Sequence, residues 1–499
     1  MKAIVIGSTK HILFACFYAC VGIACAALFA SIWYLNSGPA LDIWHTTKLK
    51  SEFTFRTPIH SFAEYQALEQ RLFDEVETQI YQKAPTDNAS ALNRYVHNSF
   101  SDPANWPQNW NRSFEWPLEN AQYGVLLLHG MSDSPYALSN IATHYKGRAH
   151  VLGLRLPGHG TIPSGLTELY WQDLAAAVSL ATAHMKHVLG DKPLYVVGFS
   201  TGGALALNHV LAQLQQDNVS DYAAMIMISP AIGLAPIAAG ARWQRWIGQL
   251  LSLDKLEWNS LQIEYDPFKY TSFAVNAGDV VYRLALHNQA LLASMTPQQL
   301  KLVPPILTFQ SVIDATVSSA AVIDNLYRFL PEGQHQLVLF DINRINVNTD
   351  LLIDDPLNAM KATLLQPALP YRLSLIENQS SDTTLVQVHD FGRYTESSPE
   401  QLSLAWPPQV YSLSHIALPF AADDSLYGTK VDRKAHRIQI GNAASRGERG
   451  MFSVSASEML RQKYNPFFPY LIRRIDEYLA QQQGSASVLE PTSGNAPIP

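Results

Sequence analysis

Short apolar runs recur along the chain from residue 124 onward, and segments of helical composition separate them. The runs are rich in large and β-branched apolar residues, which is typical of strands buried on both faces. Predicted strands cover residues 124–129, 151–155, 194–197, 223–229, 305–310, 336–340 and 410–414. Predicted helices cover residues 167–189, 204–211, 318–330 and 469–482. This alternation predicts an α/β fold with a mostly parallel sheet and helices on both faces.

Two segments interrupt the alternation. Residues 230–302 are helical in composition and rich in aromatic side chains, and residues 341–408 form a second, irregular insertion. The aromatic residues of the first segment are Trp243, Trp246, Trp258, Tyr265, Phe268, Tyr270 and Phe273. We therefore expect one α/β domain over residues 114–482 that carries two insertions. The Ser-, Pro- and Gly-rich tail at residues 483–499 is expected to be disordered.

An amphipathic helix is predicted before this domain, within a linker and helical extension over residues 36–113. Ser61 and Glu64 have the spacing of a capping box, which marks the start of a helix that continues to about residue 82. Apolar residues recur on one face of this helix. They are Phe62, Tyr65, Leu68, Leu72, Phe73, Val76 and Ile80. We expect this face to pack against the domain.

The N-terminal segment has the pattern of a membrane anchor. Residues 12–35 are uncharged and apolar over a length that can cross a bilayer as one helix. Lys2 and Lys10 lie in the preceding stub, 1–11, so the positive-inside rule places the stub in the cytoplasm and the domain in the periplasm or another extracytoplasmic compartment. A cleaved signal peptide is the alternative, although its apolar region is usually shorter. All three cysteines lie in this stretch, so the domain needs no disulfide.

Composition and charge exclude some classes of function. The formal net charge of −7 gives no support to nucleic-acid binding, which favours a basic surface. His184 and His187 are three residues apart in a predicted helix, but no third ligand follows in a known spacing. They indicate a solvated helix face rather than a metal site.

The strongest chemical signal is a complete G-x-S-x-G at residues 198–202, between a predicted strand and a predicted helix. In this context the serine occupies a sharp strand-to-helix turn with a strained backbone, and small neighbours allow the turn to form. The helix N-terminus then supplies free N–H groups and a positive dipole end beside the hydroxyl. Ser200 is therefore the candidate nucleophile.

A serine nucleophile needs a base that takes its proton and a third group that orients the base. In an open parallel sheet these groups belong at the carboxyl ends of strands. Asp314 follows the predicted strand at 305–310, and His415 follows the one at 410–414. We predict Asp314 as the acid and His415 as the base.

Three other residues compete for these roles. Asp341 is the second candidate for the acid. Asp324 is a weaker candidate because it lies inside a predicted helix. His389 is the rival base, within the segment 386–390.

The motifs together resemble those of the α/β-hydrolase superfamily. The closest branch is that of the carboxylesterases and monoacylglycerol lipases, which has serine aminopeptidase-like relatives. The matching segments are 129–131 (His-Gly-Met), 157–160 (Pro-Gly-His-Gly), 198–202, the segment around Asp314, and 414–415. The order Ser200, Asp314, His415 is also the family's order. The interval between the acid and the base is longer than is usual in the family, and the insertion at 341–408 accounts for it.

The resemblance implies further site residues. The backbone N–H groups of Met131 and Thr201 would form the oxyanion hole. Residues 230–302 would form a cap over the serine, with aromatic side chains lining an apolar acyl pocket. Neither a metal nor a cofactor is implied.

The resulting hypothesis is a membrane-anchored serine hydrolase. Ser200 would attack the carbonyl of a carboxylic ester, His415 would accept and return the proton, and Asp314 would orient the imidazole. The expected partners are a small-molecule or lipid ester, such as a monoacylglycerol, a lysophospholipid or a medium-chain acyl ester, and the bilayer. A peptidase or amidase with the same triad is one alternative. The other is a non-catalytic, membrane-tethered scaffold with a hydrolase fold.

Overall fold

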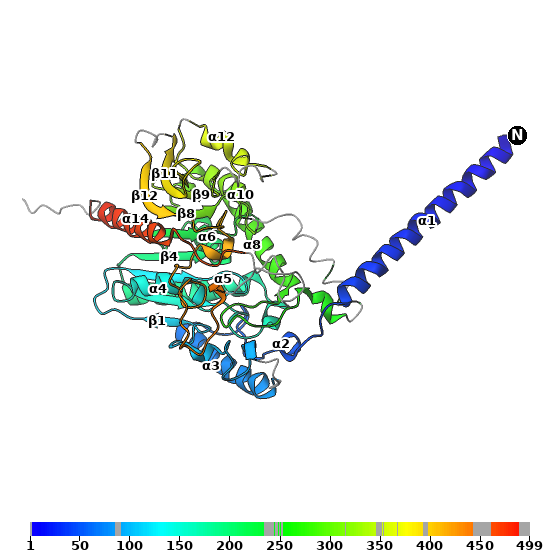
Figure 1. Ribbon diagram of the computed structural model, residues 1–499, viewed down its shortest axis with the longest axis horizontal. Helices are drawn as coiled ribbons and strands as arrows, with labels where there is room; N and C mark the ends of the chain where they lie inside the picture. The colour runs from blue at the N-terminus through cyan, green and yellow to red at the C-terminus, as the bar shows by residue number, and fades with distance from the viewer. Residues whose placement is uncertain are drawn as a thin grey trace, which may run out of the picture.

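A ten-stranded sheet forms the centre of the molecule, in the order β1-β3-β2-β4-β5-β8-β9-β10-β11-β12 (Figure 1). The computed structural model describes residues 2–84, 91–233, 244, 248, 250, 253–314, 316–345, 352, 354–366, 368–392, 398–442 and 461–488. The strands of the sheet are β1 (Phe114–Trp116), β2 (Gly124–Leu128), β3 (His150–Leu154), β4 (Leu194–Phe199), β5 (Ala224–Ile228), β8 (Ile306–Ser311), β9 (Gln336–Phe340), β10 (Arg372–Asn378), β11 (Leu385–Phe391) and β12 (Glu400–Ala405). A separate antiparallel pair consists of β6 (Trp258–Ser260) and β7 (Phe273–Ala274).

The neighbouring strands from β3 across to β10 all run parallel to one another. Strand β1 at one edge and strands β11 and β12 at the other are antiparallel to their neighbours. Every residue of β2, β3, β4, β5, β8 and β9 is buried, which explains why these segments are mainly apolar. The predicted α/β fold with a mostly parallel sheet is confirmed.

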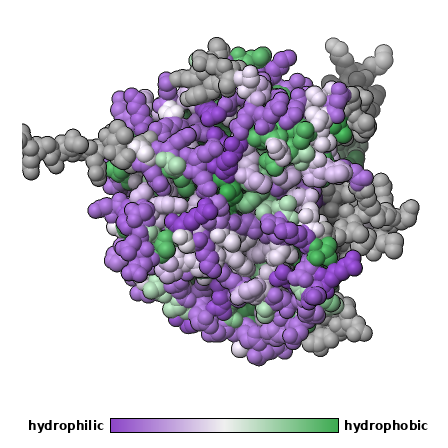
Figure 2. All heavy atoms as spheres, turned by 60° about the vertical axis from the view of Figure 1, so that its left-hand side comes forward, coloured by the Kyte–Doolittle hydropathy of each residue, from purple (hydrophilic) through white to green (hydrophobic). Residues whose placement is uncertain are grey.

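Helices cover both faces of the sheet. The α-helices of the described residues are α1 (Lys2–Asn36), α2 (Ile43–Thr46), α3 (Phe62–Gln79), α4 (Ser139–Tyr145), α5 (Trp171–Leu189), α6 (Thr201–Gln215), α8 (Val275–Ser294), α9 (Pro297–Leu300), α10 (Ser319–Asn325), α12 (Lys361–Leu364) and α14 (Phe468–Val488). One apolar core joins the sheet to α5, α6, α8 and α10, and a second joins its other face to α4 and α14. The face drawn in Figure 2 is mainly hydrophilic, with apolar residues scattered over it.

The structure corrects the sequence-based prediction between residues 341 and 414. The predicted strand at 410–414 is absent, and the segment 341–408, expected to be irregular, adds β10, β11 and β12 to the main sheet. Strand β10 pairs with β9 along five residues and takes the place that 410–414 was expected to fill. Residues 410 and 411 are instead held by Asn343, whose side chain and backbone N–H donate to their carbonyl oxygens at 3.1 and 2.7 Å.

Helix boundaries also differ from the prediction at several ends. The helix expected at 167–189 begins at Trp171, and the one expected at 318–330 is divided into α10 and a 3-10 turn, Tyr327–Phe329. Helix α14 continues to Val488, so the first residues of the expected tail at 483–499 are helical and its last eleven lie outside the described residues. Part of the predicted cap, including Trp243 and Trp246, also lies outside them.

Helix α1 projects away from the rest of the molecule (Figure 1). Its segment Leu13–Tyr34 is long and apolar enough to cross a membrane, and none of it is buried in the structure. A signal sequence near an N-terminus can meet the same criteria of length and composition. Just after α1, the carbonyl oxygen of Gly38 accepts a hydrogen bond of 2.8 Å from Lys255 Nζ in the predicted cap. The C-terminal end of α1 is thus held beside the predicted cap.

The predicted amphipathic helix is α3. The Ser61 hydroxyl accepts a hydrogen bond from the backbone N–H of Glu64 at 3.2 Å, as a helix N-cap does. Six of the seven residues expected on its apolar face are buried, and Phe73 is half-buried. The helix packs on the domain through this face, as the sequence predicts.

A buried ion-pair cluster also fixes the N-terminal extension to the domain. Arg155, just after β3, is 1% exposed, and its guanidinium donates to Glu69 of α3 at 2.7 Å and to Glu52 at 3.1 Å. The same guanidinium donates to the carbonyl oxygen of His159 at 2.9 Å. Breaking a buried pair leaves an uncompensated charge, so such a cluster specifies how its segments dock. The extension is therefore an integral part of the fold.

Candidate active site

Ser200 occupies the turn between β4 and α6, and its backbone is in a conformation that L-residues rarely adopt, with φ 53° and ψ −115°. The two flanking glycines leave no room for a side chain. A Cβ at Gly198 would lie 2.5 Å from the backbone nitrogen of Gly203, and a Cβ at Gly202 would lie 2.0 Å from the carbonyl oxygen of Leu128. The turn thus has the strained geometry that the motif predicts.

The loop after β2 lies directly against this serine. A Cβ on Gly130 would lie 3.1 Å from the Cβ of Ser200, so the two backbones approach closely. Among the described residues, the backbone N–H groups of Met131 and Thr201 donate to no acceptor of the protein. Two unpaired N–H groups beside a nucleophile are the donors that an oxyanion hole requires.

His129 fixes the peptide group that carries one of these donors. Its Nδ1–H donates to the carbonyl oxygen of Gly130 at 2.8 Å, and its Nε2 accepts from the backbone N–H of Leu156 at 3.0 Å. Burial, with His159 nearby, holds the pKa of His129 well below its usual value, so the ring is neutral, as this bonding pattern requires. In a trans peptide the C=O and N–H groups point in opposite directions. Holding the oxygen of Gly130 therefore also orients the N–H of Met131.

Asp314 and His415 form a hydrogen-bonded pair. The Nδ1 of His415 donates to Oδ2 of Asp314 at 2.8 Å, and the carboxylate side chain is fully buried. Burial alone would raise the pKa of Asp314, but the imidazole of His415 and the backbone N–H groups of residues 316 and 317 outweigh it and lower that pKa below its usual value. The pair thus combines a charged carboxylate with an oriented imidazole.

The structure brings this pair to the end of the strand that carries Ser200. The ring of His415 lies 5.1 Å from the ring of Phe199, the residue before the serine. Among the described residues no hydrogen bond joins the Ser200 hydroxyl to His415. Catalytic hydrogen bonds are often long in structures without substrate and tighten when it binds.

The competing acids and the rival base have other partners. The buried carboxylate of Asp341 pairs with Arg344, and Asp324 on α10 pairs at 2.7 Å with Arg328 of the 3-10 turn that follows. His389 lies on β11, where its Nδ1 is 3.4 Å from a carboxylate oxygen of Glu377. The geometry therefore favours Asp314 and His415 over these residues.

Gln310 is a site residue that the sequence prediction missed. It lies in β8 with its side chain buried, and its Nε2 donates to Oδ2 of Asp314 at 3.1 Å. A glutamine within a predicted buried strand, four positions before the acid, was the available signal. Gln310 thus donates to the same carboxylate oxygen as His415.

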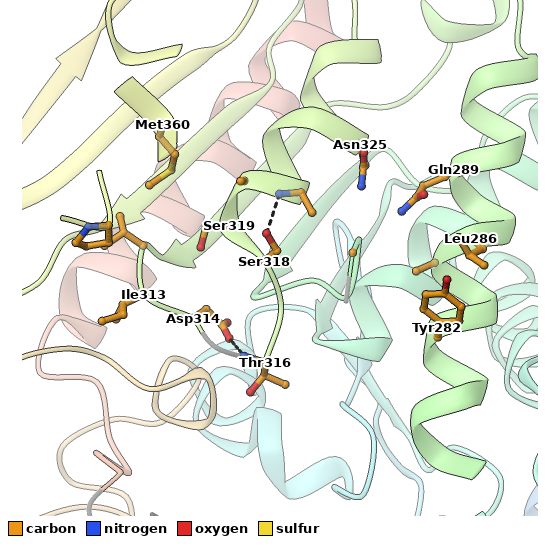
Figure 3. A pocket seen from close by; sticks show the side chains of 16 residues that line it. Tyr282, Leu286, Gln289, Ile313, Asp314, Thr316, Ser318, Ser319, Asn325 and Met360 are labelled. Atoms are coloured by element: carbon orange, nitrogen blue, oxygen red, sulfur yellow. Dashed lines mark hydrogen bonds between the residues drawn. The ribbon is translucent and has the colours of Figure 1, made fainter. Parts of the chain in front are cut away.

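A cavity of about 730 Å³ adjoins Asp314 (Figure 3). Helix α8 forms one wall and the segment from the end of β8 into α10 forms another, and Pro356 and Met360 contribute from the segment before β10. Figure 3 shows side chains of both kinds around it, with Leu286 and Ile313 among the apolar ones and Gln289 and Ser318 among the polar ones. Such mixed lining suits an apolar ligand that carries a polar group.

The alpha/beta hydrolase family matches residues 125–341 of the chain. The matched segment begins in β2, ends directly after β9, and contains Ser200 and Asp314. The fold is therefore that of an alpha/beta hydrolase. His415 lies beyond the matched part of the chain, after strands β10, β11 and β12.

Individual relatives also match parts of this chain. A thermostable monoacylglycerol lipase of Bacillus sp. (strain H-257) is 31% identical over 123 residues, which are 24% of this chain and 46% of that enzyme. The match thus spans about half of the relative's length. Among solved structures, a metagenome-derived lipolytic enzyme is 20% identical with a TM-score of 0.35, over 46% of this chain and 87% of that one. A soluble variant of monoglyceride lipase from Saccharomyces cerevisiae, in complex with a substrate analog, is 16% identical with a TM-score of 0.35, over 46% and 82%.

Proposed function

We propose that this chain is a membrane-anchored serine hydrolase that cleaves carboxylic esters through an acyl-enzyme. The family match and the similarity to a monoacylglycerol lipase support a hydrolase of the lipase or esterase type. The orientation of His415 is the observation that supports the more specific proposal, a serine hydrolase that cleaves esters through an acyl-enzyme. Its Nδ1–H is held by the buried carboxylate of Asp314 while its ring lies beside the strained turn at Ser200.

The proposed reaction depends on which ring nitrogen of His415 is free to accept a proton. Because Nδ1 of His415 donates to Asp314, Nε2 is the nitrogen that can take the proton of the Ser200 hydroxyl as that oxygen attacks the carbonyl carbon. The N–H groups of Met131 and Thr201 would stabilise the oxyanion that forms. His415 then gives its proton to the leaving alcohol, which leaves an acyl group on the serine. Water hydrolyses this acyl-enzyme by the same two proton transfers in turn.

The substrate that we propose is a lipid-like or medium-chain acyl ester. The cavity beside Asp314 supports it because it has room and apolar lining for an acyl chain, next to polar groups for an ester or a hydroxylated head group. Helix α1 supports it because an anchor would keep the enzyme at a bilayer, where such esters partition. With the stub 1–11 in the cytoplasm, the hydrolase would lie on the other side of that bilayer.

The test uses the full chain in detergent, with p-nitrophenyl esters of increasing acyl length and a fluorophosphonate probe. We expect hydrolysis with a preference for some chain length, and labelling that Ser200→Ala abolishes together with nearly all activity. Absence of both labelling and hydrolysis would overturn the proposal and favour the scaffold alternative. Labelling at Ser200 with hydrolysis of aminoacyl arylamides but of no ester would instead identify a peptidase or amidase.

A further inference from the structure

A carboxylate lies unusually close to the proposed oxyanion hole. Asp133 follows Met131 by two residues in the loop after β2, and its side chain is largely buried. A Cβ placed on Gly130 would lie 2.6 Å from Oδ2 of Asp133 and 3.1 Å from the Cβ of Ser200, so the carboxylate and the serine lie within about 6 Å of each other. A negative charge at this place opposes the negative charge that develops on the oxyanion.

A single cation in the predicted cap offsets this carboxylate. Lys269 Nζ donates to Oδ1 of Asp133 at 2.5 Å. The lysine belongs to the segment between β6 and β7, far from the loop in sequence, and its ammonium group is the ion-pair partner of Asp133 among the described residues. The pair joins the cap to the loop that carries an oxyanion donor.

The backbone around Lys269 is held in place for this contact. Its N–H donates to Oδ1 of Asp266 at 3.1 Å, and Asp266 is buried and also accepts from the hydroxyl of Tyr427. The next residue, Tyr270, donates its backbone N–H to the carbonyl oxygen of Ser132 at 2.8 Å. These hydrogen bonds therefore hold the backbone of Lys269 close to Asp133.

We propose that Lys269 is a positioning residue of the oxyanion hole, which neutralises Asp133 so that the oxyanion can form beside it. The proposal rests on the proposed function, because it assumes acyl transfer at Ser200. Its consequence is that the segment between β6 and β7 is a working part of the catalytic centre. The predicted cap would thus supply a positive charge that catalysis requires, in addition to any contact with substrate.

The test compares Lys269→Gln, Asp133→Asn and the double variant with the wild-type chain, on one p-nitrophenyl ester. Lys48→Gln is the matched control, since Lys48 also pairs with a carboxylate, that of Glu168, on the exposed surface. We expect Lys269→Gln to lower kcat by about ten- to a hundredfold, the effect of one uncompensated charge at about 6 Å in a medium of effective dielectric 20. KM should change little. Lys48→Gln should leave both constants unchanged.

The other two variants separate charge from structure. Neutralising the carboxylate removes the charge that needs compensation, so Asp133→Asn should lower kcat far less than Lys269→Gln does, and the double variant should recover most of the loss of Lys269→Gln. If the pair only fastened the cap, either single variant would lower kcat and the double variant would recover nothing, which would overturn the inference. Wild-type kcat in Lys269→Gln would also overturn it. A wild-type chain that neither hydrolyses esters nor reacts with the fluorophosphonate would instead mean that the proposed function is wrong.

Discussion

Ser200 and His415, the proposed nucleophile and base, reach the same end of the sheet by different routes. The region of the nucleophile is contiguous: β4, the serine turn and α6 follow one another within residues 194–215. Its geometry is enforced by close contacts of the backbone with itself and with the end of β2, since glycines 198 and 202 have no space for a Cβ. Steric contacts within the turn and with the neighbouring strand thus fix it.

The region of the base is assembled from distant segments. Asp314 follows β8, whereas His415 begins a 3-10 turn, His415–Ala417, after β10, β11 and β12 have added to the sheet. No strand positions His415 directly. The chain beyond it is held through Asp424, which accepts from the hydroxyl of Tyr136 at 2.9 Å and from the amide of Asn140 at 2.9 Å.

This difference shows which parts of the site depend on the whole fold. A change near the serine acts on the turn itself, and its effect should be local. A change in the three added strands acts on the segment that delivers the histidine, even though those strands contribute no predicted catalytic group. The predictions below test each region in turn.

The largest effect is expected from the base itself. His415→Ala removes the group that accepts the serine proton, and we expect kcat to fall by about 10⁴- to 10⁶-fold, as for triad residues that act as a unit. The matched variant is His389→Ala, which removes the rival histidine on β11 and should retain wild-type kcat. Steady-state ester hydrolysis by both variants measures this. The opposite pattern would show that the pair at Asp314 does not serve catalysis.

The sequence predicts the region of Ser200 better than the region of His415, because only the first is built mainly from residues that are adjacent in sequence. The strand, the glycines and the helix around Ser200 are adjacent in sequence. Their pattern therefore predicts the strand-to-helix turn, which the structure has at residues 198–202. The turn and the N–H group of Thr201 depend on interactions within a few residues of one another. The approach of Met131 depends in addition on the pairing of β2 with β4.

The segment between Asp314 and His415 was predicted less well. The sequence assigns a strand to 410–414 because a short apolar run precedes the histidine, but β10 pairs with β9 instead. A strand's place in a sheet depends on competition between segments that are far apart, which local pattern does not encode. The pairing of Gln310 with Asp314 and of Lys269 with Asp133 is likewise a product of tertiary contact.

A smaller effect, on stability, is expected in the segment between β9 and the added strands. Arg344 donates to Asp355 at 2.7 Å and pairs with Asp341, whose side chain is fully buried directly after β9. Arg344→Met leaves that carboxylate buried without its cation, which should destabilise the fold by about 3 kcal/mol. Thermal unfolding of the full chain in detergent measures the loss.

A matched control and a pH series test the cause. Arg328→Met breaks the exposed pair with Asp324 and should change stability by no more than about 0.5 kcal/mol. Burial raises the pKa of Asp341 above its usual value even with Arg344 present, so the folded state binds its proton more tightly than the unfolded state. The stability of Arg344→Met should therefore fall as pH rises through that raised pKa, and its defect should shrink in acid. A defect that does not depend on pH would show that lost packing, and not the buried charge, is its cause.

The smallest effect is expected at the serine turn, and it has the opposite sign. Ser200→Gly and Ser200→Ala both lack the nucleophile, and they differ only in the Cβ that strains a backbone at φ 53°. Glycine adopts such a conformation without that penalty, so Ser200→Gly should be more stable than Ser200→Ala by about 1 kcal/mol. In an ordinary helical position the same comparison favours alanine by about the same amount. A higher melting temperature for the alanine variant would contradict this prediction. It would mean that the turn relaxes to a backbone conformation that accepts a Cβ without strain.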